Sequence, residues 1–221
     1  RPLLVRSAQQ EGLSFINPKM VESIGFSAGG YSAEYGDKMS SVLDITYRRP
    51  KQFEGSVSVG LLGGDIHIGN TSGRFSHITS IRYKTNKSFM NTTDTKAEYN
   101  PSFSDIQSYM VYNVSDKWDV SFLGNYSHNI YKYAPQTRNT SFGTLDMLRN
   151  FKVYFNGQEK DKFQTYQAAL IAKGKINEKL NIGFSASTFG SDEQENYDIR
   201  GRYLLSEIEA GGNQNENRKA V

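Results

Sequence analysis

From residue 52 to about residue 187 the sequence alternates between apolar and polar residues with a period of two. At the start of this region, for example, Phe53, Val57 and Val59 are separated by polar residues or glycine. Successive side chains of a β-strand point to opposite faces of its sheet, so this pattern gives each strand one apolar and one polar face. Apolar residues at helical spacing are nearly absent. The sequence therefore predicts a chain that is mainly β.

The alternation predicts about seven strands. They fall at residues 52–61, 65–69, 75–84, 105–114, 118–127, 165–176 and 180–187. Most approach the ~9–11 residues that a tilted strand needs to cross a bilayer.

The connections between these strands alternate between short and long. Short turns are expected at residues 70–74, 115–117 and 177–179, and long loops at 85–102 and 128–162; the tight turn at 62–64 is the exception. Outer-membrane barrels have short turns on one side and long loops on the other, whereas a soluble sandwich gives no reason for such an alternation. The connections therefore favour part of a transmembrane antiparallel β-barrel.

Composition is compatible with two classes of protein. Only 37% of the 221 residues are hydrophobic, and no apolar run approaches the ~18 residues of a membrane helix. A soluble domain of this composition would have a thin core, whereas a barrel needs apolar residues on one face of each strand only. The aromatic content of 13% fits either an ordinary β-rich globular protein or a barrel with aromatic girdles.

Several function classes are disfavoured. The absence of cysteine removes disulfides, thiolate metal sites and cysteine nucleophiles, and a net charge of +3 is too small to indicate nucleic-acid binding. His67, His77 and His128 lack the spacing of a metal site. The Ser-His neighbours at 76–77 and 127–128 lie within strands and would point to opposite faces, so neither pair forms a dyad. We therefore predict no enzymatic activity, catalytic residue, metal or cofactor.

Residues 15–50 have a different pattern from the alternating region. Two apolar-patterned runs, at 20–26 and 41–47, flank two turns that are rich in glycine. Glycine reaches backbone angles that other residues adopt only at a cost, so the chain is able to reverse here. Pro50 cannot donate to a strand ladder and is expected to end the second run. We expect a compact β element followed by a basic exit.

Residues 27–45 contain a glycine-aromatic turn, a Tyr-Gly turn and the run Ser-Ser-Val-Leu-Asp-Ile at residues 40–45. With these motifs the stretch resembles the last part of the plug domain of TonB-dependent outer-membrane receptors, most of all the large Bacteroidetes-type receptors. The residues expected to form the two structural turns are Gly29, Gly30, Tyr31, Tyr35, Gly36 and Asp37.

This resemblance implies a domain organisation and a function. Residues 1–50 would be the C-terminal part of an α/β plug domain, and residues 51–221 the first strands of the barrel, in a fragment of a longer chain. Such a receptor lies in the cell outer membrane, binds a nutrient ligand and imports it when the inner-membrane TonB energy-coupling complex acts on the plug, through a segment missing here. A surface lipoprotein is a further partner to consider. The alternative is a non-transporting surface β-sheet protein that serves in binding or adhesion.

The longest expected loop, residues 128–162, is the candidate ligand site. It would lie on the outer side of the membrane, and it combines aromatic with basic residues. Aromatic rings stack on apolar ligand surfaces, while Arg and Lys attract anionic groups. The alternative is an ordinary surface loop whose aromatic residues pack on one another. The candidate ligand-binding residues are Tyr131, Tyr133, Arg138, Phe142, Arg149, Phe151 and Tyr154.

Overall fold

The structure is a computed structural model, and it describes residues 16–30, 32, 35, 41–85, 97–144, 147–208 and 218–220. Of the residues that the structure describes, 82% lie in strands, so this part of the chain is mainly β. The elements are η1 (Pro18–Met20), β1 (Val21–Ala28), β2 (Ser41–Tyr47), β3 (Glu54–Gly60), β4 (Gly63–Ser72), β5 (Phe75–Thr85), β6 (Ala97–Tyr99), β7 (Ser102–Ser115), β8 (Trp118–Pro135), β9 (Arg138–Thr144), β10 (Met147–Lys175), β11 (Asn181–Ile208) and β12 (Arg218–Ala220). Among the described residues the only helical element is the 3-10 turn η1.

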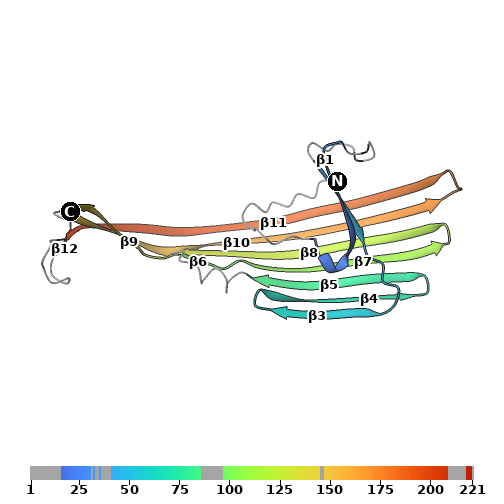
Figure 1. Cartoon of the computed structure of the whole chain (residues 1–221), viewed down its shortest axis with the longest axis horizontal. Coiled ribbons are helices and arrows are strands. Elements are labelled where there is room, and N and C mark those ends of the chain that lie inside the picture. Colours follow the sequence, from blue (N-terminus) through green and yellow to red (C-terminus); the bar gives the residue numbers. More distant parts are fainter. Residues whose placement is uncertain are drawn as a thin grey trace. The chain divides into compact units, whose positions relative to one another are not determined.

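The strands form two sheets. β1 and β2 pair antiparallel in a two-stranded sheet. The other strands form a 10-stranded sheet in the order β12-β11-β10-β8-β7-β5-β4-β3, with β6 added beside β8 and β9 beside β10 (Figure 1). The main strands follow one another across the sheet in sequence order, as in a meander. The expected antiparallel architecture is therefore confirmed.

The chain divides into two compact units, which we describe separately. Unit 1 comprises residues 1–84, 103–129 and 163–192, and unit 2 comprises residues 85–102, 130–162 and 193–221. The long strands β8, β10 and β11 contribute to both units. The division does not test the domain boundary expected near residue 50, which stays a prediction.

In unit 1 the predicted alternation of faces is confirmed. On β5, Ile78, Ser80 and Arg82 are buried, whereas the intervening Ile81 and Tyr83 are 52% and 51% exposed. β7 shows the same pattern, with buried residues at 103, 105, 107 and 111 and exposed ones at 106, 112 and 114. We call the face with the buried residues the inner face and the opposite one the outer face.

Burial in this chain is the reverse of that in an ordinary globular domain. The buried apolar residues of the described part are few: Met20, Val42, Ile78, Phe103 and Val111. Polar and charged residues are buried in greater number: Asn17, Ser80, Arg82, Asp105, Gln107, Ser121, Ser127, Asn150, Asp161 and Ser206. The large apolar side chains on the outer face of unit 1 are meanwhile exposed.

The expectation of a long loop at residues 128–162 was wrong. These residues extend β8 to Pro135, form β9 and begin β10 at Met147. β11 likewise continues to Ile208 instead of ending near residue 187, so the acidic residues 192–195 lie in a strand and not at the start of a loop. Both faces of these segments carry polar residues, so the sequence shows no apolar alternation that would have indicated strands.

The N-terminal segment (residues 16–50) forms the expected β element. Its two apolar runs correspond to β1 and β2, and β2 ends at Tyr47 before the Arg-Arg-Pro sequence. Asn17 caps η1 by accepting a hydrogen bond from the Lys19 amide through its side chain at 3.1 Å. The assignment of this segment to an α/β plug domain stays a prediction.

Candidate functional site

The candidate ligand-binding residues lie on strands of unit 2. Tyr131 and Tyr133 are on β8, Arg138 and Phe142 on β9, and Arg149, Phe151 and Tyr154 on β10. Strand pairing holds such residues at defined positions relative to one another, which a mobile loop would not do.

The pairing of β9 with β10 places four of these residues on one face. Arg149 is directly opposite Phe142, and Phe151 is two residues further along the same face of β10. Arg138 is opposite Val153, which shares that face by alternation. We call Arg138, Phe142, Arg149 and Phe151 the Arg–Phe face.

A further aromatic residue, which the sequence did not single out, extends this face. The ring of Tyr203 on β11 lies 6.0 Å from that of Phe151, in a tilted arrangement. The side chain of Tyr203 is 76% exposed and that of Phe142 is 50% exposed. The spacing of Tyr203 from Phe151 in sequence gives no sign of this neighbourhood, which follows only from the pairing of β10 with β11.

The other candidate residues are not part of the Arg–Phe face. Tyr154 lies on the opposite face of β10, where the Lys152 ammonium is 4.7 Å from the centre of its ring. Tyr131 and Tyr133 share one face of β8, and Tyr133 is paired with Tyr99 of β6. The strand pairing therefore brings four of the seven candidate residues together on one face, and their role in ligand binding stays a prediction.

The Arg–Phe face has the chemistry of a recognition surface. Exposed phenyl rings offer flat apolar area, and a guanidinium group binds carboxylates or phosphates through paired hydrogen bonds. Two arginines beside two phenylalanines would suit a ligand that has both a flat apolar part and an anionic group.

An acidic cluster lies on the same long strands in unit 2. Burial, the Asp161 carboxylate and the more distant Glu195 together raise the pKa of the Glu159 carboxyl above its ordinary value. Asp161 is only 2% exposed, and its Oδ1 atom has no hydrogen-bond partner. The Glu159 carboxyl therefore keeps its proton to a higher pH than an ordinary glutamate does.

A buried ion pair between β5 and β7 lies on the inner face of unit 1 and contacts the N-terminal segment through one hydrogen bond. Arg82 donates to both carboxylate oxygens of Asp105, at 2.9 and 2.5 Å, and a third donor on its guanidinium reaches the carbonyl oxygen of Ile16 at 3.0 Å. The side chains of Arg82 and Asp105 are 4% and 0% exposed. Both residues lie at inward-facing positions of the alternation, but the sequence did not single out this pair.

Further contacts join the segment to consecutive strands. Lys19 binds Ser56 and Ser58 of β3 and pairs with Asp65 of β4. The Asn17 amide donates to Ser80 Oγ of β5 at 2.6 Å, the Gln107 amide of β7 donates to the Tyr47 hydroxyl at 3.1 Å, and Arg49 pairs with Asp119 of β8 at 3.0 Å. The N-terminal segment thus contacts five neighbouring strands through their inner face.

The structural turns of this segment are described in part. Gly29 and Gly30 have φ angles of 74° and 60°, in the left-handed region that favours glycine. The Tyr35 amide donates to the Ser32 carbonyl, and its hydroxyl donates to Asp44 at 3.1 Å. Tyr31, Gly36 and Asp37 lie outside the described residues. A structural role therefore fits Gly29, Gly30 and Tyr35.

The described residues contain no group of three His, Cys, Asp or Glu side chains placed to bind a metal ion. The histidines have other partners: His67 Nδ1 lies 2.7 Å from Ser56 Oγ, and His128 Nδ1 lies 3.1 Å from the Gln164 amide. In the same part of the chain, no helix is long and apolar enough to span a bilayer.

No protein-family model matches this chain, and neither a curated protein nor a solved structure is similar enough to count as a match.

Proposed function

We propose that the chain is part of a TonB-dependent outer-membrane receptor, which binds a nutrient ligand and imports it through a plug-gated β-barrel. The observation that carries this proposal is the reversed burial of unit 1, where polar residues are buried on the inner face and large apolar residues are exposed on the outer face. Exposed apolar patches above a few hundred Å² are rare in soluble monomers and mark contact with lipid or a partner.

Lipid is the environment that suits this outer face. A membrane barrel has an apolar exterior, and its interior is wet or filled by protein. The exposed apolar residues lie on consecutive strands at every second position. They include Val57, Val59, Ile66, Ile68, Ile81, Tyr83, Ile106, Tyr112, Val114, Phe122, Tyr126, Tyr166, Leu170 and Phe184. An apolar face of this extent is favourable in hydrocarbon, at about 25 cal/mol per Å² relative to water.

The contacts of the N-terminal segment support a plug role. The segment meets the polar inner face through hydrogen bonds and ion pairs, such as the hydrogen bond from Arg82 to the Ile16 carbonyl and the ion pair of Lys19 with Asp65. Polar contacts of this kind exchange for water at modest net cost when a plug moves, whereas a packed apolar contact would not. The energy-coupling complex would act on a part of the plug that precedes these residues.

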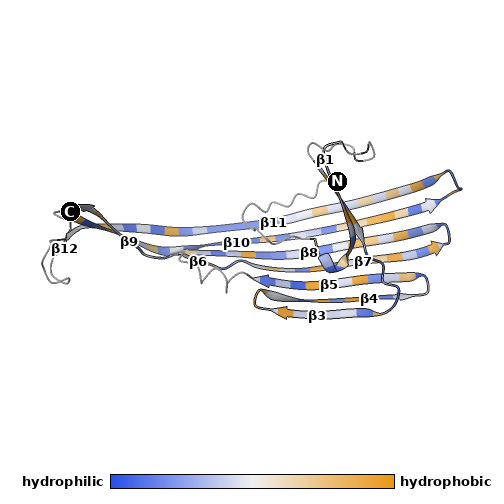
Figure 2. Cartoon of the chain, in the orientation of Figure 1, coloured by the Kyte–Doolittle hydropathy of each residue, from blue (hydrophilic) through white to orange (hydrophobic). Residues whose placement is uncertain are grey.

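The strands continue well past the length that a bilayer requires, which supports an external ligand site. β10 has 29 residues and β11 has 28, against the ~9–11 that cross a membrane. Their parts in unit 2 are mostly hydrophilic (Figure 2). We place the Arg–Phe face in this extension, outside the membrane, where a nutrient ligand or a surface lipoprotein would meet it. We propose no catalytic role and no cofactor.

A second candidate is a surface protein that binds or adheres without transport. The exposure of the Arg–Phe face on an extended sheet favours it, because flat sheet surfaces suit macromolecular partners as well as ligands. Electrical conductance separates the two candidates. In planar bilayers, the full-length receptor should be closed in buffer and should conduct ions while urea displaces the plug. A barrel that stays closed in urea although the N-terminal segment becomes accessible to protease would favour the second candidate.

The ligand site has its own test in cells that express the full-length receptor. Depletion of compounds from a defined nutrient mixture, followed by mass spectrometry, would report uptake. Phe142→Ala and Arg149→Ala should each slow the uptake of the depleted compound, because both side chains belong to the Arg–Phe face. Tyr154→Ala is the matched control, since Tyr154 lies on the opposite face of the same strand. Equal uptake by all three variants would show that the ligand site lies elsewhere.

A further inference from the structure

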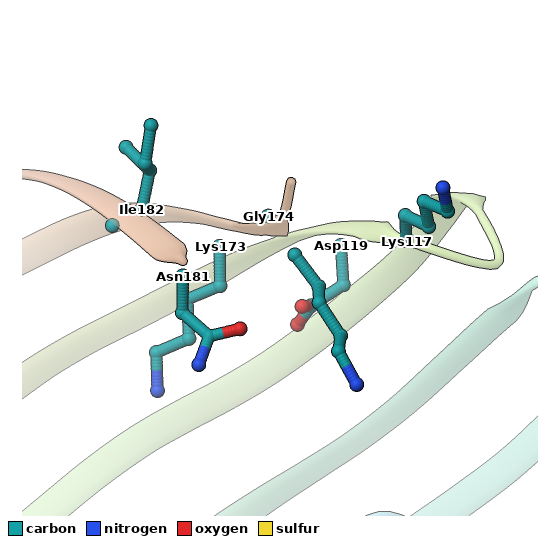
Figure 3. A pocket seen from close by; sticks show the side chains of 8 residues that line it. Lys117, Asp119, Lys173, Gly174, Asn181 and Ile182 are labelled. Carbon is teal, nitrogen blue, oxygen red and sulfur yellow. The ribbon is translucent and has the colours of Figure 1, made fainter. Parts of the chain in front are cut away.

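A pocket of about 410 Å³ lies in unit 1 beside the short turns that join β7 to β8 and β10 to β11. It is separate from the Arg–Phe face, which belongs to unit 2. Its polar lining residues are Lys117, Asp119, Lys173, Lys175 and Asn181. The lining therefore combines three lysines with one carboxylate, although Figure 3 shows the Lys117 side chain directed to the side of Ile182, away from Lys173 and Asp119.

The positive charges of this pocket are not neutralised within the described part of the chain. Asp119 already pairs with Arg49 at 3.0 Å. Lys117, Lys173 and Lys175 have no ion-pair partner within 4.0 Å there. Like charges held near one another repel, and an anion between them would relieve that repulsion.

The geometry leaves room for such an anion. Lys173 and Lys175 are two residues apart on β10 and share a face. Figure 3 shows Lys173, Asp119 and Asn181 directed to one side of the strands and Ile182 to the other. A Cβ atom added to Gly183, which also lines the pocket, would meet nothing within 4 Å. The pocket is therefore open on the side to which the lysine and the asparagine amide point.

We propose that this pocket binds a phosphate group. Lysine ammonium groups act as point charges toward phosphate, and a doubly charged oxyanion is able to pair with more than one of them at once. The Asn181 amide is able to add a neutral hydrogen bond. The volume is near the lower end of the roughly 300–1,000 Å³ range of ligand pockets, which suits a small phosphorylated group better than a large ligand.

The phosphate has two conceivable sources, free phosphate and the headgroup of a membrane lipid. The lipid source rests on the proposed outer-membrane function, in which the short turns lie at a membrane surface. On the outer face beside the pocket, the ring of Trp118 covers Gly174. A Cβ atom added to Gly174 would lie 2.3 to 2.5 Å from carbon atoms of that ring. Tryptophan is enriched at membrane interfaces, which fits this position.

The test uses the full-length receptor in a neutral detergent. Inorganic phosphate is titrated by calorimetry, and micelles doped with phosphatidic acid are titrated in parallel. The double variant Lys173→Gln/Lys175→Gln should weaken binding of the effective probe by at least about tenfold. Lys179→Gln is the matched control, because Lys179 lies in the same β10–β11 turn but does not line the pocket; it should bind as the wild type does.

Each outcome decides the proposal. Binding of inorganic phosphate that depends on Lys173 and Lys175 identifies free phosphate as the source, and binding of phosphatidic acid alone identifies a lipid headgroup. The proposal is overturned if neither probe binds, or if Lys179→Gln weakens binding as much as the double variant. Failure of the receptor to insert into lipid bilayers would count against the proposed function, while the phosphate titration in detergent would still test the pocket.

Discussion

At the scale of single residues, the buried charge pair Arg82–Asp105 joins β5 to β7, and Arg82 also donates to the Ile16 carbonyl of the N-terminal segment. Both side chains are almost fully buried, and each satisfies the other. Removing one partner of a buried pair leaves an uncompensated charge in a medium of low polarity, which is far more costly than the loss of an exposed pair.

We therefore expect Arg82→Leu to destabilise the full-length receptor by about 3–5 kcal/mol. Arg200→Leu is the control, because the Arg200–Asp198 pair is 3.4 Å long with side chains 81% and 75% exposed; it should change stability by less than about 1 kcal/mol. Urea unfolding followed by tryptophan fluorescence measures both. Equal stability of the two variants would show that the Arg82–Asp105 pair does not stabilise the sheet.

A second residue-scale prediction concerns the close approach of Pro50 to Gly69 on β4. A Cβ atom at position 69 would lie 2.6 Å from Pro50 Cγ and 3.3 Å from the carbonyl oxygen of His77. Gly69→Ala should therefore destabilise the protein by about 1–3 kcal/mol through overpacking. Gly183→Ala, which adds a Cβ in open space, should be neutral to within about 0.5 kcal/mol in the same unfolding assay. If both substitutions are neutral, the segment does not pack against β4 at this point.

At the scale of elements, β10 and β11 carry the acidic cluster in the part that lies outside the proposed membrane span. The pKa of Glu159 is raised in the folded state, so folding is favoured while this carboxyl is protonated. That stability is present below the ordinary pKa of a glutamate and is lost as the pH rises through the raised value in the folded protein. Paired β-strands should consequently open more readily at neutral pH around residues 159–161.

Glu159→Gln should remove this pH dependence. We expect slower amide hydrogen exchange of residues 159–161 at neutral pH in the variant than in the wild type, and equal exchange in mildly acidic buffer after correction for intrinsic rates. Lys152→Gln, on the same strand but away from the carboxylates, is the control. Unchanged amide hydrogen exchange in Glu159→Gln at neutral pH would contradict a destabilising effect of the Glu159 charge beside Asp161 and Glu195.

The same elements show how far the sequence predicts the fold. Strands β3, β4, β5, β7 and the first part of β8 were predicted from residues such as Ile81 and Tyr83, which alternate with Ser80 and Arg82, because one face of unit 1 is apolar. The extension of β8, the whole of β9 and the first half of β10 were not predicted, because a strand with two polar faces has no apolar period.

The candidate site was predictable in composition but not in arrangement. The sequence already shows that residues 128–162 are rich in aromatic and basic side chains. Which of them meet depends on the register of β9 with β10, which sets Phe142 opposite Arg149 and leaves Tyr154 on the other face. Tyr203 joins from β11, more than fifty residues away in sequence from Phe151, and no local spacing indicates that neighbourhood.

At the scale of the whole molecule, the account depends on the opposite chemistry of the two faces of the sheet. The inner face of unit 1 carries buried polar groups and receives the N-terminal segment, and the outer face carries exposed Ile, Val, Leu, Phe and Tyr. The central claim is that lipid covers this outer face in the native protein. A sheet whose apolar face were covered by a protein partner would have the same pattern of burial, so a measurement must identify lipid itself.

Site-directed spin labelling along β7 makes that measurement most directly. The 221 residues contain no cysteine that would compete with an introduced one for the spin label. Labels are placed singly at residues 106 to 112 of the full-length receptor in lipid bilayers, and their collision rates with oxygen and with a water-soluble nickel complex are compared. The account predicts a period of two: oxygen collisions dominate at residues 106, 108, 110 and 112, and are low at 107, 109 and 111. High nickel accessibility at the even positions, or no periodicity along the strand, would contradict it.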